Sequence, residues 1–223
     1  MNDREVADYL LANPDFFVEH AELLSTLRLG NPHGKAAVSL QERQMEMLRD
    51  KNKHLERRLS ELVRYGHEND SIASKFVRWT SRVVAERDPY ALPRTISHNL
   101  RDLFDVPQAA LRVWDVAETY SQADFARDAG EEVRLFANSL ATPYCGANTG
   151  FAAAQWLDTA DGAPESVALV ALRAPEVDAQ ANAFGLLVMG SPDPRRFHDG
   201  MATDFLTQIG ALASAALTRV LPH

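Results

Sequence analysis

The chain has 223 residues, with 23 Lys and Arg, 31 Asp and Glu, and a formal net charge of −8 at pH 7. Apolar residues make up 46% and charged residues 24%, which excludes collagen-like, disulfide-stapled and wholly disordered chains. Cys145 is the only cysteine, so an intrachain disulfide and a cysteine-based zinc site are also excluded. No run of about 18 apolar residues occurs and the acidic N-terminus does not resemble a signal peptide, so we expect a cytoplasmic protein without a membrane partner.

The charge is distributed unevenly along the chain. Residues 31–90 have a net charge of +3, whereas residues 1–30 and 91–223 have net charges of −4 and −7. The acidic C-terminal part argues against nucleic acid as a partner, because contacts to phosphates require a basic surface. The small basic excess in the middle is mixed with acidic residues and is typical of a solvated helix face.

Residues 1–30 predict an N-terminal helical unit of two short helices. Asn2 or Asp3 can cap the first helix. Asn13-Pro14 begins the second, since Asn favours the cap and Pro the first helical position. So short a unit is marginal in water, and we expect it to pack on another helix, in the same chain or in another subunit. The side chains expected in that contact are Phe16, Phe17, Leu23 and Leu24.

Residues 31–88 combine a linker with one long helix. Ser39-Leu40-Gln41-Glu42 matches the capping box, in which a serine and a glutamate satisfy the first backbone N–H groups of a helix. No proline follows until Pro89, so we predict a helix from about residue 39 to about residue 87, roughly 70 Å long at 1.5 Å per residue. A helix of that length cannot bury itself in so small a chain and needs a partner.

A heptad pattern indicates that this partner is a second copy of the chain. Leucine occupies three consecutive d positions, and Asn52 lies at an a position, where a polar residue fixes the register of parallel two-stranded coiled coils. The alternative is an amphipathic helix that lies on its own domain. The predicted dimer seam consists of Met45, Leu48, Asn52, Leu55, Leu59 and Leu62. Beyond it the apolar stripe shifts phase near Gly66, and we expect Ile72, Phe76, Trp79 and Val83 to face the C-terminal domain.

Residues 89–223 predict a domain of the α+β class. Helical spacing covers residues 89–104, and alternation indicates a strand at 109–116. A polar loop (117–130), a short helix (131–140) and a turn-rich stretch (143–150) follow, and residues 151–157 are ambiguous between helix and strand. Continuous apolar runs at 166–172 and 184–190 are typical of buried strands, and a last helix follows Pro194.

Five stretches in chain order resemble a known family. They are Asn13-Pro14-Asp15-Phe16-Phe17; His33-Gly34 with Val38-Ser39-Leu40-x-Glu42-Arg43-Gln44; Cys145-Gly146; Gly185 to Gly190-Ser191; and Arg196-Phe197 with Met201-Ala202-Thr203. Together they resemble the bacterial domain-of-unknown-function family 484, whose C-terminal part is related to GAF domains. The resemblance implies a GAF-like sheet flanked by helices and preceded by a long dimerising helix. It implies no particular ligand or reaction, because GAF domains as a class bind small molecules or act as dimeric signalling modules.

The candidate ligand site combines a strand with the segment that follows it. Arg112 and Trp114 are two residues apart on the predicted strand and therefore share one face. They could supply a charge and a stacking surface for an anionic or planar ligand, or they could face solvent or an interface. We expect a pocket between the sheet and residues 120–157. The candidate ligand-binding set is Arg112, Trp114, Cys145, Phe151 and Trp156.

Catalytic and metal chemistry have little support. No histidine spacing offers Cys145 a base, so we interpret Cys145 as a small buried thiol rather than a nucleophile. No two histidines lie three to five residues apart beside a carboxylate, as a metal site would require. Gly185 to Gly190-Ser191 lacks the lysine of a phosphate-binding loop.

We therefore expect a non-catalytic, homodimeric regulatory protein whose GAF-like domain binds a small molecule; the sequence identifies neither that ligand nor any cofactor. The alternative is a scaffold or adaptor whose domain binds protein and no small ligand. An enzyme like the free-methionine-sulfoxide reductases among GAF relatives is disfavoured, because one cysteine cannot form an intramolecular redox pair. A polar-lined cavity would favour the sensor, and a solid core with an exposed apolar patch would favour the adaptor.

Overall fold

The computed structural model describes residues 2–26, 28–30, 37–160, 162–174, 182–201 and 203–222, with side chains of residues 24–42 left out. The chain divides into two compact units, Met1–Glu68 and Asn69–His223. The boundary between them falls within the long helix. No described helix is long and apolar enough to cross a membrane.

The N-terminal unit contains three short helices where two were expected: α1 (Asp3–Ala12), α2 (Phe16–Glu19) and α3 (Ala21–Thr26). Asn2 caps α1 through a reciprocal pair of hydrogen bonds with Glu5. The predicted second helix is interrupted at His20, whose ring lies 4.7 Å from that of Phe16. The ring of Phe16 also packs edge-on against Tyr9 of α1, at 6.2 Å between centroids. This contact lies within the N-terminal unit, so the packing of the unit on another helix stays a prediction.

A two-stranded antiparallel hairpin of β1 (Arg28–Gly30) and β2 (Ala37–Ser39) follows and was not predicted. The long helix α4 (Leu40–Ala85) confirms the prediction for residues 39–87. It continues as a regular helix through Gly66, where the phase shift had been expected. The capping-box side chains Ser39 and Glu42, the side chain of Leu24 and the His33-Gly34 pair lie outside the described residues.

The C-terminal unit is built on a four-stranded sheet in the order β3-β6-β5-β4, with every neighbouring pair antiparallel. The strands are β3 (Gln108–Val113), β4 (Tyr144–Ala147), β5 (Ser166–Leu172) and β6 (Gly185–Ser191). Three of them confirm the predicted strands. The expectation of a turn at β4 is wrong, because Tyr144 and Cys145 pair with Leu169 and Ala168 of β5, and this tertiary pairing overrides the local preference of the Gly-containing stretch.

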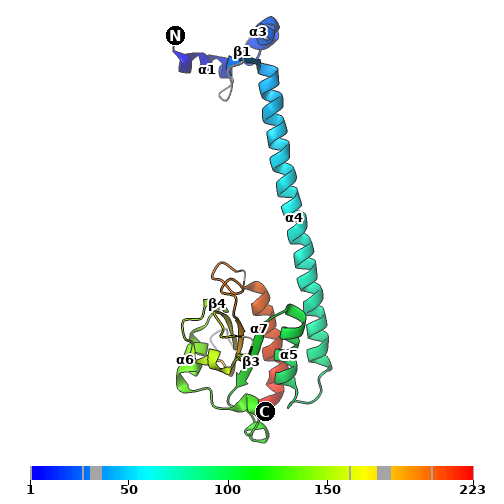
Figure 1. Cartoon of the computed structure of the whole chain (residues 1–223), viewed down its shortest axis with the longest axis vertical. Helices are drawn as coiled ribbons and strands as arrows, with labels where there is room; N and C mark the ends of the chain where they lie inside the picture. Colours follow the sequence, from blue (N-terminus) through cyan, green and yellow to red (C-terminus); the bar gives the residue numbers. More distant parts are fainter. Residues whose placement is uncertain are drawn as a thin grey trace. The chain divides into compact units, whose positions relative to one another are not determined.

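Helices cover both faces of this sheet (Figure 1). On one face, α5 (Leu92–Phe104) packs on β3 and α7 (Asp204–Leu217) packs on β5. The C-terminal end of α4 joins this layer, as predicted for its second apolar stripe: Trp79 and Val83 are fully buried, and the Trp79 indole donates a hydrogen bond to the carbonyl of Ile96. On the other face lie α6 (Glu131–Ser139) and η3 (Ala152–Trp156), over a second apolar core. The α+β class, the long helix and the sheet flanked by helices are thus confirmed.

The predicted loop at 117–130 runs from β3 to α6 and contains two short 3-10 turns, η1 (Glu118–Tyr120) and η2 (Asp124–Ala126). Of these, η2 packs against β3. Phe125 in η2 is buried in the core beneath α5, which holds this turn close to the outer strand of the sheet. This contact positions the site described next.

Candidate functional site

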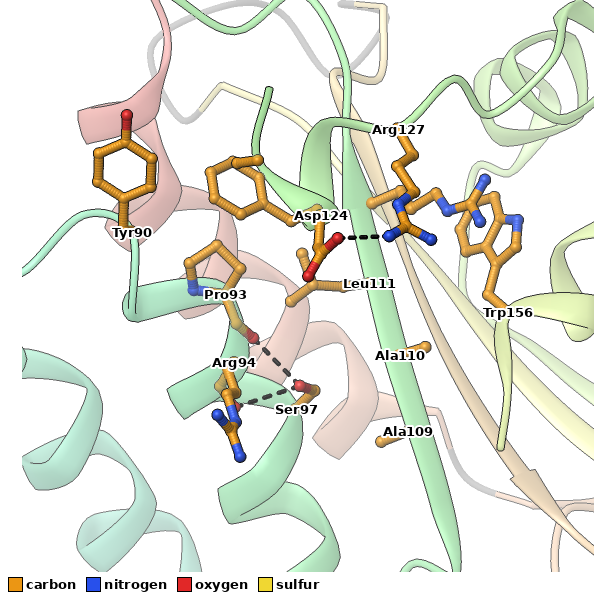
Figure 2. Close-up of a pocket in the computed structure, with 13 residues that line it drawn as sticks. Tyr90, Pro93, Arg94, Ser97, Ala109, Ala110, Leu111, Asp124, Arg127 and Trp156 are labelled. Atoms are coloured by element: carbon orange, nitrogen blue, oxygen red, sulfur yellow. Dashed lines mark hydrogen bonds and ion pairs between the residues drawn. The ribbon is translucent and has the colours of Figure 1, made fainter. Parts of the chain in front are cut away.

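A groove of about 580 Å³ runs along the outer edge of β3, and we call it the β3 groove (Figure 2). β3 forms one wall and the first turns of α5 form the other, while η2 lies between them. Trp156 of η3 lies on the far side of β3 from α5. The lining residues are Tyr90, Pro93, Arg94, Ser97, Ala109, Ala110, Leu111, Arg112, Ala123, Asp124, Phe125, Arg127 and Trp156.

The backbone of β3 contributes unpaired groups to this groove. β3 is an edge strand, and Trp114, just beyond its end, donates its backbone N–H to the carbonyl of Phe184, 2.8 Å away, on the β6 side. Because N–H and C=O groups alternate in direction along an antiparallel strand, those of Ala109 and Leu111 point away from β6 toward the groove. Within the described part of the chain, these outward groups have no hydrogen-bond partner.

Arg112 is the central side chain of the site. Its guanidinium lies over the ring of Trp156, 4.6 Å from the centroid, and its Nη1 donates a hydrogen bond of 2.7 Å to the carbonyl of Asp128. Burial lowers the pKa of Arg112, and the neighbouring charge of Arg127 lowers it further, against the opposing effect of Asp128. Two like charges are therefore held near each other, an arrangement that a bound anion would stabilise.

The balance of charge in the groove is positive. Three of its lining side chains are arginines, and only Asp124 carries the opposite charge. Asp124 is paired with Arg127 at 2.6 Å. Among the described residues Arg112 makes no ion pair, because its hydrogen bond goes to a neutral carbonyl. The groove is thus a cationic site on a segment, residues 91–223, whose net charge is −7.

Trp114 shares a face of the sheet with Arg112, as predicted, but it does not line the groove. It is 5% exposed and belongs to the core under α6, where its indole N–H donates a hydrogen bond of 2.6 Å to the carbonyl of Ala183. The expectation that Trp114 offers a stacking surface to a ligand is therefore wrong, since its ring is already covered by packed side chains.

Phe151 and Cys145 also lie apart from the groove. Phe151 borders a separate pocket of about 220 Å³ beside α6, and its ring packs on those of Phe136 and Tyr144. Cys145 is buried on the face of the sheet that α5 and α7 cover, and burial raises the pKa of its thiol. The five predicted ligand-binding residues therefore do not share one cavity; only Arg112 and Trp156 meet.

The pocket expected between the sheet and residues 120–157 corresponds in part to the β3 groove. Residues of that segment line the groove beside β3, namely Ala123, Asp124, Phe125, Arg127 and Trp156. The space between the sheet and α6 is filled instead. Small and aliphatic side chains close that face of the sheet, and each is less than 9% exposed: Val133, Ala137, Ala154, Leu157 and Leu186. Sequence reasoning missed the wall that α5 contributes to the groove, because it depends on tertiary packing. Phe125 and Arg127, which lie in the predicted loop 117–130, were not singled out as lining residues.

The chain is similar to known proteins over almost its whole length. The model of the family described as "Protein of unknown function, DUF484" matches residues 1–221. The chain belongs to the DUF484 family. It is 26% identical over 225 residues to the "Uncharacterized protein YigA" of Salmonella typhimurium (strain LT2), covering 98% of this chain and 92% of that protein. A solved structure with some similarity is the GAF domain of a protein assigned as a sensor histidine kinase from Pseudomonas syringae pv. tomato. The match has a TM-score of 0.43 and 14% identity, and covers 70% of this chain and 91% of that one.

The helix α4 of this DUF484 chain carries a second candidate surface, the predicted dimer seam. Leu48, Leu55 and Leu62 are 58%, 52% and 66% exposed in the single chain. Asn52, Leu55, Leu59 and Leu62 border a shallow apolar depression of about 480 Å³ along the helix. Met45 and Leu59 are also more than half exposed. Within the first unit, the whole seam is therefore uncovered.

Proposed function

We propose that this DUF484 protein is a homodimeric, non-catalytic regulatory protein whose C-terminal domain binds an anionic ligand in the β3 groove. The observation that carries the proposal is the pair of arginines at the groove. The Arg112 guanidinium lies over the Trp156 ring, Arg127 lines the same groove, and Arg112 makes no ion pair among the described residues. Such a pair in an otherwise acidic domain suits a ligand of opposite charge.

The geometry of Arg112 suits a carboxylate or a phosphate. A guanidinium presents its N–H groups in a planar fork that matches two oxygens of either group. Stacking on Trp156 restricts the orientation of this fork, so less conformational freedom is lost when a ligand binds. Asp124 pairs with Arg127 from the same turn, three residues earlier in the chain.

Dimerisation through α4 is the second part of the proposal. Its support is the row of leucines at d positions whose side chains are more than half exposed in the single chain. Water contact with so many large apolar side chains is unfavourable, and pairing two copies of the helix would remove it. Asn52 in the same row would favour a parallel, two-stranded arrangement.

The proposal assigns no reaction to the protein. Cys145, the one cysteine, has a thiol whose pKa is raised by burial, whereas a nucleophilic cysteine needs a lowered pKa. Among the residues that the structure describes, no group of three or more His, Cys, Asp or Glu side chains could hold a metal ion. The cytoplasmic location expected from the sequence stays a prediction.

One observation favours the alternative of a protein-binding adaptor. The interior face under α6 is filled by packed side chains, whereas the β3 groove is an open surface feature that includes an unpaired strand edge. A protein partner could therefore supply the anion. In that case the β3 groove would still be the binding site.

The proposal is tested by the melting temperature of the full chain with and without anions. Citrate and pyrophosphate serve as carboxylate and phosphate probes. A ligand at a hundred times its Kd stabilises the folded state by about 2.7 kcal/mol, which raises the melting temperature by several degrees. We expect this shift for the native chain and for the control Arg195→Gln, whose arginine is 91% exposed outside the groove, but not for Arg112→Gln. An equal shift in Arg112→Gln would show that the groove is not the site.

A further inference from the structure

We propose that the anion bound in the β3 groove is part of an extended peptide segment of a partner protein, which pairs with β3 as a fifth strand of the sheet. This inference rests on the proposed function, because it uses the same groove and the same arginines. It adds the chemical class of the ligand and the manner in which the ligand binds.

The backbone of β3 is suited to pairing with a further strand. An exposed strand edge presents a row of N–H and C=O groups that another chain can pair with, and many peptide-recognition domains bind in this way. The outward groups of Ala109 and Leu111 are unpaired among the described residues, and both residues line the groove. Ala109 and Ala110 have the smallest side chains along the wall, so a peptide can approach to the usual strand spacing of about 4.8 Å.

The two sides of the groove differ in chemistry. On the side of α5 most of the lining groups are apolar, among them Pro93, Leu111 and Phe125. Arg94 and Ser97 also lie on this side (Figure 2). On the side of Trp156 it presents Arg127 (Figure 2) and Arg112, whose guanidinium lies over the Trp156 ring. Successive side chains of a strand point to opposite faces of the sheet. A peptide paired with β3 would therefore place every second side chain against the apolar side and the others against the arginines, which predicts a segment of alternating apolar and acidic residues.

Charge favours a different protein over a second copy of this chain as the occupant. Pairing of two β3 edges would bring Arg112 and Arg127 of both copies to one shared boundary. Like charges at neighbouring positions of paired strands are destabilising. An acidic segment has the complementary charge, so the groove itself selects between these occupants.

The test uses a fluorescent, end-blocked octapeptide of alternating valine and glutamate, titrated into the full chain and followed by fluorescence anisotropy. The first control peptide has the same sequence with every backbone nitrogen methylated, so that it keeps its charge and donates no backbone hydrogen bond to β3 from either edge. The second has the same composition with its four glutamates and four valines in separate blocks. Citrate is titrated in parallel as a free anion.

We expect the alternating peptide to bind at least about tenfold more tightly than either control peptide, because each control loses hydrogen bonds or side-chain contacts. Arg112→Gln should weaken its binding, and Arg195→Gln should not. Hydrogen exchange gives a separate readout: bound peptide should slow exchange at the amides of Ala109 and Leu111, while Ala110 and Arg112, whose N–H groups face β6, should change little.

Other results overturn the inference in distinguishable ways. If the methylated peptide or citrate binds as well as the alternating peptide, and Arg112→Gln removes all binding, strand pairing is wrong while the anion site stands. If neither peptides nor citrate and pyrophosphate bind, both proposals fail. If the amides of Ala109 and Leu111 become protected as the protein alone is concentrated, the occupant is a second copy of the chain and the proposed partner is wrong.

Discussion

At the scale of single residues, the proposed anion binding depends most on the pair formed by Arg112 and Trp156. Trp156→Ala removes the surface on which the guanidinium lies, while Trp156→Phe keeps a smaller ring. We expect Trp156→Ala to weaken binding of an anion by about the 0.5–2 kcal/mol of a cation–π contact, and Trp156→Phe to weaken it less. Calorimetric titration with the anion that stabilises the native chain measures this order. Tighter binding by the alanine variant would contradict the assigned role of Trp156.

The burial of Cys145 predicts how ionisation of its thiol affects the stability of the fold. Because burial raises the pKa of its thiol, the folded chain keeps a proton that the unfolded chain loses above the ordinary thiol pKa of about 8.5. Deprotonation then favours the unfolded state, so the contribution of Cys145 to stability is complete below that pH and declines as the pH rises further. Cys145→Ala should remove this part of the pH dependence and cost about 1 kcal/mol at pH 7 if a small cavity remains.

Denaturant unfolding of the native and Cys145→Ala chains at pH 7 and pH 9.5 checks this prediction. Labelling by a mild thiol reagent should also be slower in the folded chain than for a free thiol. Labelling that is faster than for a free thiol would indicate a functional cysteine instead.

At the scale of elements, the proposed dimer depends on α4. Asn52→Leu exchanges a polar side chain at the predicted seam for an apolar one. We expect the dimer to become more stable and the preference for two strands to weaken, because a buried amide costs stability and fixes register. Sedimentation equilibrium measures both effects. A native chain that is monomeric at tens of micromolar would contradict the coiled-coil dimer.

Gly66 gives a second, independent prediction on the same helix. It lies in the interior of α4, and a Cβ atom added there would meet nothing within 4 Å in the single chain. Gly66→Ala should therefore stabilise the helix by roughly 0.5–1 kcal/mol through helix propensity. Urea unfolding followed by circular dichroism measures the change, and a loss of stability would indicate that the dimer or another partner uses the space beside Gly66.

The elements that could be predicted from the sequence are those whose signal is local. α4 follows from an uninterrupted run without proline, and β5 and β6 follow from continuous apolar residues between breaks. β4 was missed because its four residues include Gly146 and acquire their extended form from pairing with β5. The β3 groove was anticipated in part, through Arg112, Trp156 and the segment 120–157, whereas the wall that α5 contributes depends on tertiary packing.

At the scale of the whole molecule, the two proposed binding surfaces belong to different units of the chain. The seam on α4 would set the number of copies, and the β3 groove would recognise the ligand. A family model that matches residues 1–221 includes both surfaces. Loss of ligand binding through Arg112→Gln should therefore leave the dimer intact, since the substitution lies outside the seam.

Native mass spectrometry of the chain purified from its own host tests the central claim most directly, because it reports stoichiometry and any retained ligand together. The account predicts the mass of two chains with an added mass that is present in the native protein and in Arg195→Gln and absent from an equally dimeric Arg112→Gln. A single chain, or an added mass that Arg112→Gln retains in full, would contradict it.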